Sequence, residues 1–232
     1  GGTDVIGCLV MGNIFDKVYA GEIQGASLAI DVDIYNDLGA PVVNDDKGEL
    51  VVKSPFPSMP IQFWNDPLKE KIKSAYFSKF PNIWHHGDYI QKTTNGGFVI
   101  HGRSDATLNP GGVRIGTAEI YRQVESFDEI EESVVVGQSF DDDIRIVLFV
   151  KMNMNFDLTD ELTQKIKSSI KNNCSPRHVP SIILKCPDVP KTKSGKVVEI
   201  AVRMLLNGEE VNNLESIANP ECLKYFRNIG KA

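Results

Sequence analysis

The order of apolar and polar residues in the first part of the chain predicts extended strands. Every second position is apolar from residue 28 to 34, which is the period of a strand with one buried face. An Asp-Asp-Lys-Gly turn at 45–48 precedes an apolar run at 50–52, and residues 98–101, Phe-Val-Ile-His, predict a further strand. Residues 25–105 are therefore predicted to be rich in strands.

Proline residues interrupt this strand pattern. Pro55, Pro57 and Pro60 each fix φ and lack a backbone donor, so the segment that carries them is expected to be an extended loop. Asp66 followed by Pro67 is typical of a helix start, because proline is tolerated in the first turn and aspartate caps free backbone N–H groups. A short helix is predicted from this pair onward.

After Asp105 the pattern changes to a mixture of helices and strands. Apolar residues at helical spacing predict a helix over 120–127, and residues 130–136, which end in three valines, predict a strand. Three consecutive aspartates at 141–143 form an acidic turn, after which residues 144–150 are expected to pair back as a hairpin.

The remainder of the chain continues in the same mixed pattern. Apolar positions 162, 166 and 170 lie on one face of a helix that Thr159 is expected to cap. Residues 181–184 predict a third strand, and residues 197–206 predict a closing helix that Gly208 ends. The whole pattern predicts an α+β chain, with a strand-rich first part and a small α+β domain from Asp105 onward.

Composition narrows the class of protein. With 232 residues, 41% hydrophobic and 24% charged, the chain has the averages of a globular protein, and its net charge of −6 argues against nucleic acid or an anionic membrane as a partner. The apolar run at 146–150 is far too short to span a membrane. The four cysteines lack Cys-x-x-Cys spacing, so reduced thiols in a cytoplasmic protein are expected rather than a zinc site.

The sequence Pro-Lys-Thr-Lys-Ser-Gly-Lys at 190–196 predicts a basic loop aimed at an anion. It is not a P-loop, because that motif needs glycine where Pro190 stands and serine or threonine where Val197 stands. A solvated lysine-rich turn is the alternative when the segment is taken alone.

Two upstream segments favour the interpretation of this loop as one that binds an anion. They are Trp-His-His-Gly-Asp at 84–88 and Gly-Arg-Ser-Asp-Ala-Thr-Leu-Asn-Pro-Gly-Gly-Val-Arg-Ile at 102–115. In this order, the two segments and the lysine-rich loop resemble the adenylate-forming superfamily of acyl-CoA synthetases, luciferases and peptide-synthetase adenylation domains. Further segments are similar to the ligases of this superfamily that activate acetoacetate; they are residues 53–60, 63–67, 116–122, 175–180 and 206–221.

The resemblance covers essentially the whole chain but only the C-terminal part of such an enzyme. It implies that residues 1–104 are the strand-rich end of the large adenylate-forming (AMP-binding) domain and residues 105–232 the small C-terminal lid domain. Because the chain begins at Gly1 without an initiator Met, we expect it to be truncated. An upstream Ser/Thr/Gly-rich phosphate loop and most of the acyl pocket would be missing, so the fragment alone is expected to be inactive.

The activity that the resemblance implies is that of an ATP-dependent acid–thiol ligase. The complete enzyme would convert acetoacetate, ATP and CoA to acetoacetyl-CoA, AMP and pyrophosphate, with Mg²⁺. A ligase for acetate or propionate shares the same main motifs and stays open. A non-catalytic module that binds an adenylate or docks a partner is the alternative of a different class.

The resemblance also implies which residues bind the nucleotide. They are Gly2, Thr3, Asp4, Asp88, Arg103 and Arg114. Asp88 would accept hydrogen bonds from the ribose hydroxyls and Arg103 would share the ribose, although a turn aspartate and a surface ion pair are the ordinary alternatives. Asp4 stands where most relatives have Glu, so its implied part in holding Mg²⁺, through water, is weaker.

Lys196 is the catalytic residue that the resemblance implies, bridging the α-phosphate and the attacking carboxylate. Asp105 matches the hinge, whose rotation would withdraw Lys196 and bring Gly111 and Gly112 to the pantetheine tunnel. CoA-binding is implied for those two glycines and more weakly for Lys171 and Arg177, which are otherwise solvated cations. Adjacent histidines at 85 and 86 diverge if they lie on a strand, and His86 is interpreted as structural packing beside the nucleotide.

Overall fold

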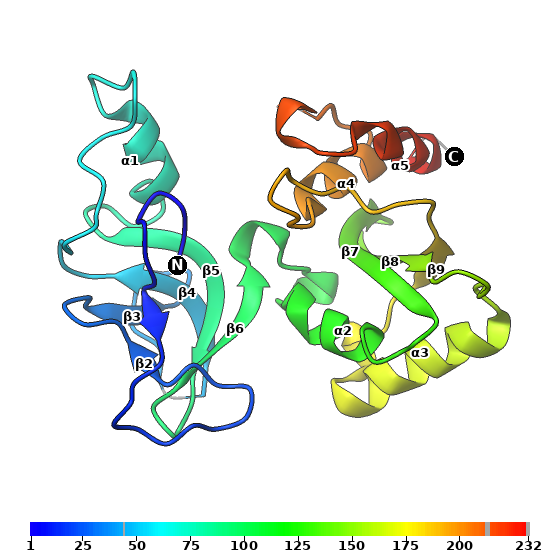
Figure 1. The fold of residues 1–232 in the computed structure, drawn as a ribbon, viewed down its shortest axis with the longest axis horizontal. Helices are drawn as coiled ribbons and strands as arrows, with labels where there is room; N and C mark the ends of the chain where they lie inside the picture. The colour runs from blue at the N-terminus through cyan, green and yellow to red at the C-terminus, as the bar shows by residue number, and fades with distance from the viewer. Residues whose placement is uncertain (44, 212–213, 231–232) are drawn as a thin grey trace. The chain divides into compact units, whose positions relative to one another are not determined.

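The computed structural model describes residues 1–43, 45–211 and 214–230. The chain forms two compact units, Gly1–Ser104 and Asp105–Ala232 (Figure 1). Each unit contains its own sheet, helices and hydrophobic core. The predicted α+β class is confirmed.

The first unit is built on a four-stranded antiparallel sheet with the strand order β3-β4-β5-β6. Its strands are β3 (Val32–Tyr35), β4 (Lys47–Val52), β5 (Trp84–Lys92) and β6 (Phe98–Arg103), and the short strands β1 (Val10–Met11) and β2 (Gly25–Ala26) form a separate pair. The core of the unit packs around fully buried Trp84, Leu50 and Ile90. The strand predicted at 98–101 and the loop predicted around the prolines are confirmed.

Two strand boundaries differ from the prediction. The alternation predicted a strand from residue 28, but β3 begins at Val32, because Ala29 has a left-handed φ of 62° that breaks an extended backbone. Gly48 was predicted to end a turn and lies instead inside β4. A Cβ at this position would lie 2.5 Å from the carbonyl oxygen of Tyr35, so only glycine allows the two strands to approach this closely.

The helix predicted from Asp66 begins later. Helix α1 (Glu70–Tyr76) starts after Lys69, whose φ of 57° is left-handed, so the predicted start was wrong by four residues. Asp66 still caps the helix, because its carboxylate accepts the backbone N–H groups of Lys71 and Ile72, both at 3.1 Å. Burial alone would raise the pKa of Asp66, but these backbone donors hold it below its usual range.

The second unit has a three-stranded sheet with helices on both faces. Its elements are α2 (Thr117–Val124), β7 (Ile130–Phe140), β8 (Asp143–Met152), α3 (Asp160–Asn173), β9 (Ile182–Lys185), α4 (Glu199–Leu206) and α5 (Leu223–Gly230). β7 and β8 are antiparallel, whereas β9 lies parallel to β8 and is reached through α3. Neighbouring residues of β7 face opposite sides: Val135 packs in the cluster that includes residues of α2 and α3, and Val134 packs in the cluster that includes residues of α4 and α5.

Most local predictions for this unit are confirmed. Asp141 and Asp142 have φ values of 47° and 59°, so they form the two-residue turn that lets β7 and β8 pair as a hairpin. The hydroxyl of Thr159 accepts the N–H of Leu162 at 3.2 Å and caps α3. Helix α4 begins two residues later than predicted, at Glu199, and the sequence did not predict α5.

The four cysteines are free, and their burial is unequal. Cys186 and Cys222 lie in the core of the second unit, where burial raises the pKa of their thiols to about 12 and about 11. Cys8 is exposed and Cys174 is half-buried. Within the described ranges, no helix combines the length and apolarity needed to cross a membrane.

Candidate functional site

Asp88 and Arg103, two of the residues predicted to bind the nucleotide, lie side by side on neighbouring strands of the first unit. They are directly paired positions of β5 and β6, and Nη1 of Arg103 lies 3.6 Å from a carboxylate oxygen of Asp88. Gly87, with a φ of 81°, makes room for this arrangement, because a Cβ there would lie 3.0 Å from Nη2 of Arg103. The sheet register therefore places an acceptor and a planar donor side by side, the chemistry that ribose hydroxyls require.

Behind this pair lies a buried histidine whose tautomer is fixed by its neighbours. Nε1 of Trp84 donates to Nδ1 of His86 at 3.2 Å, and since an indole N–H can only donate, Nδ1 must be the acceptor. Neutral His86 then keeps its proton on Nε2, which lies 3.6 Å from Asp88. Burial lowers the pKa of His86, although Asp88 opposes this effect. The prediction that His85 and His86 diverge is confirmed, because His85 contacts Glu49 at 2.9 Å instead.

The lowered pKa of His86 predicts that the first unit loses stability in mild acid. Below about pH 6.5 the unfolded chain binds a proton at this histidine that the folded chain does not, so the free energy of unfolding falls as the pH falls. We expect Tm to drop more between about pH 7.5 and about pH 5.5 in the parent chain than in His86→Asn. Asparagine keeps an acceptor for Trp84 but has no titrating ring. Equal pH dependence in both proteins would contradict the expectation.

The amino-terminal residues predicted to meet phosphate lie beside the same histidine. A Cβ on Gly2 would lie 3.3 Å from the ring of His86, so the backbone of Gly2 lies close to this ring. The hydroxyl of Tyr76 donates to the carboxylate of Asp4, and its ring stacks on Trp84 with 3.7 Å between centroids. Burial, and then Asp4, raise the pKa of Tyr76. Sequence reasoning missed Tyr76, since no local motif marks it.

The first unit thus brings Gly2, Asp4, Asp88 and Arg103 around one aromatic and histidine cluster. Thr3, between the first two, is exposed. Among the described residues there is no group of three or more His, Cys, Asp or Glu side chains arranged to hold a metal ion. The arrangement can accept hydroxyl donors and offers one guanidinium to an anion.

The lysine-rich segment of the second unit forms a hydrogen-bonded turn. Lys191 pairs with Val197, and the N–H of Thr192 donates to the carbonyl of Lys196 at 2.8 Å. Gly195 supplies the left-handed φ of 83° that the turn requires, and the hydroxyl of Thr192 accepts the N–H of Lys196 at 3.1 Å. Lys196 therefore sits at a defined point of a tight turn, with its side chain exposed.

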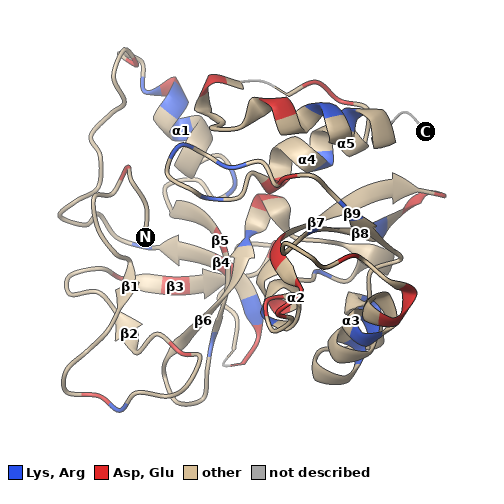
Figure 2. Ribbon diagram, turned by 45° about the vertical axis from the view of Figure 1, so that its right-hand side comes forward, with Lys and Arg blue, Asp and Glu red and all other residues tan. Residues whose placement is uncertain are grey.

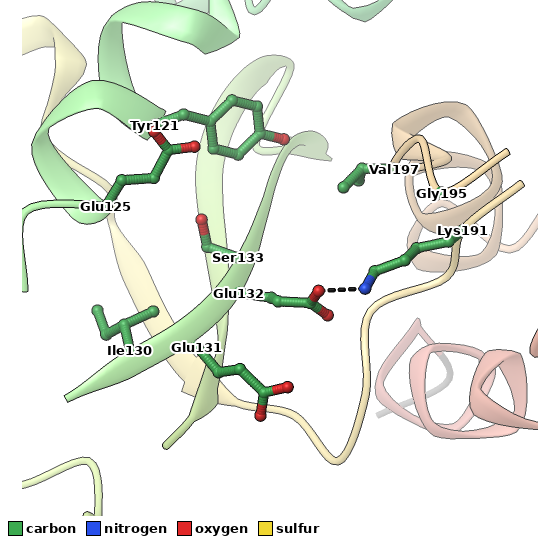
Figure 3. Close-up of a pocket in the computed structure, with 9 residues that line it drawn as sticks. All are labelled: Tyr121, Glu125, Ile130, Glu131, Glu132, Ser133, Lys191, Gly195 and Val197. Atoms are coloured by element: carbon green, nitrogen blue, oxygen red, sulfur yellow. Dashed lines mark hydrogen bonds and ion pairs between the residues drawn. The ribbon is translucent and has the colours of Figure 1, made fainter. Parts of the chain in front are cut away.

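The lysines of this turn are not equivalent. Lys191 reaches from the turn to Glu132 on β7 and forms an ion pair, beside a cavity of about 330 Å³ (Figure 3). Its charge is therefore already compensated. Lys196 has no ion pair or side-chain hydrogen bond within residues 1–43, 45–211 and 214–230, so its ammonium is available to a bound anion.

Asn219 ties the turn to the end of the chain, and sequence reasoning missed it. Its side-chain oxygen accepts the N–H of Lys191 at 2.9 Å, and its amide nitrogen donates to the carbonyl of Val189 at 2.9 Å and to Asp188 at 2.6 Å. The N–H of Ala218 adds a bond to the carbonyl of Lys191 at 2.8 Å. The segment that precedes α5 thus lies along the Lys196 turn.

Replacing Asn219 by alanine is expected to loosen the turn. The change removes three hydrogen bonds and leaves the N–H of Lys191 without its acceptor, which typically costs about 1–3 kcal/mol. We expect trypsin to cleave after the lysines of the turn about tenfold faster, as a loss of about 1.4 kcal/mol in local stability implies. Asn172→Ala, at an exposed position near the end of α3, is the control. Unchanged cleavage in Asn219→Ala would show that the asparagine does not secure the turn.

The glycine pair predicted to swing between two positions lies in a loop closed by pairing of Leu108 with Ile115. Gly111 and Gly112 have left-handed φ values of 57° and 75°, and a Cβ would meet nothing within 4 Å at either, so conformation and not crowding favours glycine. The N–H of Gly111 donates to both carboxylate oxygens of Asp143, at 2.9 and 3.1 Å. Backbone donors from Ile144 and Gly111 lower the pKa of Asp143 accordingly.

The other predicted residues of the second unit lie on different structural elements. Arg114 is half-buried in the same loop as the glycines. Lys171 is exposed in the last turn of α3, and Arg177 is exposed in a short 3-10 helix, Pro176–His178. Asp105 is exposed in a 3-10 turn, Ser104–Ala106, where the two units join. Acidic and basic residues are interspersed along both units rather than segregated (Figure 2).

Comparison with known proteins finds close relatives over nearly the whole chain, although no family model matches. The chain is 54% identical over 229 residues to the acetoacetyl-coenzyme A synthetase of Rhizobium meliloti (strain 1021), which is 99% of this chain and 35% of that protein. It is 45% identical over 231 residues to the acetoacetyl-CoA synthetase of Gallus gallus, covering 99% of this chain and 34% of the relative.

Solved structures agree with these relatives. The acetoacetyl-CoA synthetase from Streptomyces lividans superimposes with a TM-score of 0.93 and 40% identity, covering 100% of this chain and 35% of that one. A benzoate CoA ligase from Burkholderia xenovorans LB400, with a TM-score of 0.72 and 23% identity over 88% of this chain and 39% of that one, shares the fold. The chain spans about a third of the length of the relatives it matches.

Proposed function

We propose that this chain, which is homologous to acetoacetyl-CoA synthetases over 99% of its length, is the C-terminal part of an ATP-dependent ligase that joins acetoacetate to CoA. The observation that carries the proposal is the 54% identity to the Rhizobium meliloti protein, which extends through both units. It therefore includes the Asp88–Arg103 pair of the first unit and the Lys196 turn of the second. Relatives about three times longer support a preceding portion of the same polypeptide.

The proposed reaction has two steps. The carboxylate of acetoacetate attacks the α-phosphorus of ATP, forming an acyl-adenylate and releasing pyrophosphate. The thiol of CoA then attacks the acyl carbonyl, forming acetoacetyl-CoA and releasing AMP. Charge builds up on phosphate oxygens in the first step, so positioned cations supply most of what the protein contributes.

The described side chains support separate roles in this reaction. Asp88 and Arg103, paired across the sheet, would hold the ribose hydroxyls, and Gly2 and Thr3 would lie near the α-phosphate. Lys196, exposed and without a side-chain partner in the described part of the chain, would bridge the α-phosphate and the incoming carboxylate. Arg114 would approach the α-phosphate from the lid, and Gly111 and Gly112 would line the path of the thiol, with Lys171 and Arg177 as candidates for the CoA phosphates.

Asp4 fits Mg²⁺ as a single protein ligand. Its carboxylate is exposed and already accepts a hydrogen bond from Tyr76, which would orient the remaining oxygen. Mg²⁺ usually keeps several waters and binds one or two carboxylates together with substrate phosphates, so a lone aspartate suits it. When bound, the ion would neutralise phosphate charge, whereas Asp4 itself would only position it.

Two alternatives to an acetoacetate ligase remain to be tested. A ligase for acetate or propionate would use the same cluster and the same turn, and a non-catalytic module would bind an adenylate without turnover. The relatives found across the chain favour acetoacetate. The cytoplasmic location expected from the sequence stays a prediction.

The decisive experiment assays the full-length polypeptide with ATP, CoA and each carboxylate. We expect acyl-CoA to form faster from acetoacetate than from acetate or propionate at equal concentration, and AMP rather than ADP to accumulate. A preference for acetate or propionate would replace the substrate but keep the class. Nucleotide binding without any acyl-CoA, from any of the three acids, would favour the non-catalytic module. The chain of 232 residues alone is expected to form no acyl-CoA.

A further inference from the structure

The residues on either side of the junction between the two units are each bound by a side chain of their own unit. Within the first unit, the hydroxyl of Ser104 donates to the carboxylate of Glu49. Within the second unit, Nη1 of Arg203 donates to the backbone carbonyl of Asp105. These two contacts involve consecutive residues, yet their partners lie 55 and 98 positions away along the chain.

Glu49 is a fixed point of the first sheet. It lies on β4 with none of its surface exposed, although its side chain ends in a carboxyl group. The carboxylate also accepts a hydrogen bond from Nζ of Lys79 at 2.7 Å and lies 2.9 Å from Nε2 of His85. A buried carboxylate needs such partners, and their number leaves it little freedom to turn. The α-carbon of Ser104 is therefore tied to the sheet of the first unit.

Arg203 is a fixed point of the second unit. Its neighbours on α4, Ala201, Val202 and Leu205, are buried in the core cluster that also contains residues of β7. Its guanidinium is planar, so it donates hydrogen bonds in fixed directions. The carbonyl it binds belongs to the rigid peptide unit that joins Asp105 to buried Ala106. This peptide unit is therefore tied to α4.

Between these two points only three backbone bonds can turn: ψ of Ser104 and φ and ψ of Asp105. We propose that Glu49 and Arg203 are positioning residues that confine the rotation between adenylate formation and thioester formation to those three bonds. The rotation itself rests on the proposed function, whereas the two contacts are independent of it. The benefit would be accuracy, since a rotation confined to few bonds carries Lys196 and the Gly111–Gly112 loop between defined positions.

The contacts can be tested on this chain without any assay of activity. An endoprotease that cleaves before aspartate will cut the Ser104–Asp105 bond when the junction unfolds locally, and Asp141 in the exposed β7–β8 turn provides an internal reference. We expect Arg203→Met and Ser104→Ala each to raise the ratio of junction cleavage to reference cleavage about tenfold. Methionine keeps the apolar stem of the arginine and suits a helix.

Matched controls separate the contact from the substitution. Arg227→Met removes an exposed arginine from α5, and Ser78→Ala removes an exposed hydroxyl from the first unit. Both should leave the ratio at the parental value. Parental ratios in Arg203→Met and Ser104→Ala, with an unchanged Tm, would overturn the proposal.

A second arm tests the link to catalysis in the full-length ligase. The background is Asp105→Pro, in which φ at the hinge is fixed. Adding Arg203→Met removes the hydrogen bond to the carbonyl of residue 105, so neighbouring bonds should turn and acyl transfer should rise about tenfold. Arg203→Lys keeps a donor for the carbonyl and should restore less, and Arg227→Met should restore nothing. A merely structural arginine predicts the opposite sign, a further loss in the double variant, and that result would overturn the proposal. If the parent enzyme forms no acyl-adenylate, the proposed function fails, and the cleavage ratio still decides whether the contacts restrain the junction.

Discussion

Lys196→Ala is expected to slow acyl-adenylate formation by about 10²–10³-fold in the proposed full-length ligase, because removing one positioned charge-stabilising donor has a cost of that size. Lys196 sits at the end of a turn closed by the Lys191–Val197 pair, and Asn219 holds that turn against the chain end. The turn therefore fixes the backbone position from which the exposed Lys196 side chain would reach a bound anion. ATP–pyrophosphate exchange measures this step directly.

The same variant should transfer a supplied acyl-adenylate to CoA at nearly the parental rate, because the lysine is proposed to leave the site before thiol attack. Lys193→Ala is the matched control, since it removes an exposed lysine of the same turn. It should change pyrophosphate exchange by no more than a few fold. Equal loss of both half-reactions in Lys196→Ala would contradict the assigned role.

Asp105→Pro should give the opposite result, with pyrophosphate exchange retained and acyl transfer reduced about 10²-fold. Asp105 lies within a 3-10 turn, and the usual φ range of such turns includes the value that proline imposes. Proline prevents φ of residue 105 from changing. The bond of this φ is one of the three that can turn between Ser104 and the carbonyl bound by Arg203. Both rates should be measured on the same preparation.

Asp105→Ala is the control for the loss of the side chain alone, since alanine keeps the backbone freedom. We expect its acyl transfer to stay within a few fold of the parent. Acyl transfer at the parental rate in Asp105→Pro would mean that the rotation does not pass through this residue. If the proline variant lost both steps, its Tm would distinguish misfolding from a hinge that serves both conformations.

Much of the second unit could be predicted because its signals are local. The β7–β8 hairpin follows from two apolar runs around Asp141 and Asp142, and α3 follows from apolar spacing and the Thr159 cap. The starts of β3 and α1 could not be predicted in this way. Each depends on a single residue with a left-handed backbone, Ala29 or Lys69, and neither residue type signals that conformation.

For the candidate site, the sequence offered Asp88, Asp105 and Lys196 because their motifs resemble a known family, and their roles stay predictions. The residues that contact them could not be predicted from the sequence. Glu49 reads as an ordinary polar residue in a strand, and only the assembled sheet shows that it is buried beside Ser104. Asn219 is likewise a neighbour of Lys191 only in space.

The unequal burial of the cysteines provides a spectroscopic route to the motion itself. At neutral pH the thiols of Cys186 and Cys222 stay protonated inside the core, so a maleimide reagent should not modify them in the folded chain. Exposed Cys8 belongs to the first unit and half-buried Cys174 to the second. Nitroxide labels on these two native residues would therefore form one spin pair that spans the junction without any engineered cysteine. The distribution of distances between them, recorded with and without nucleotide, would count the conformations that the two units adopt.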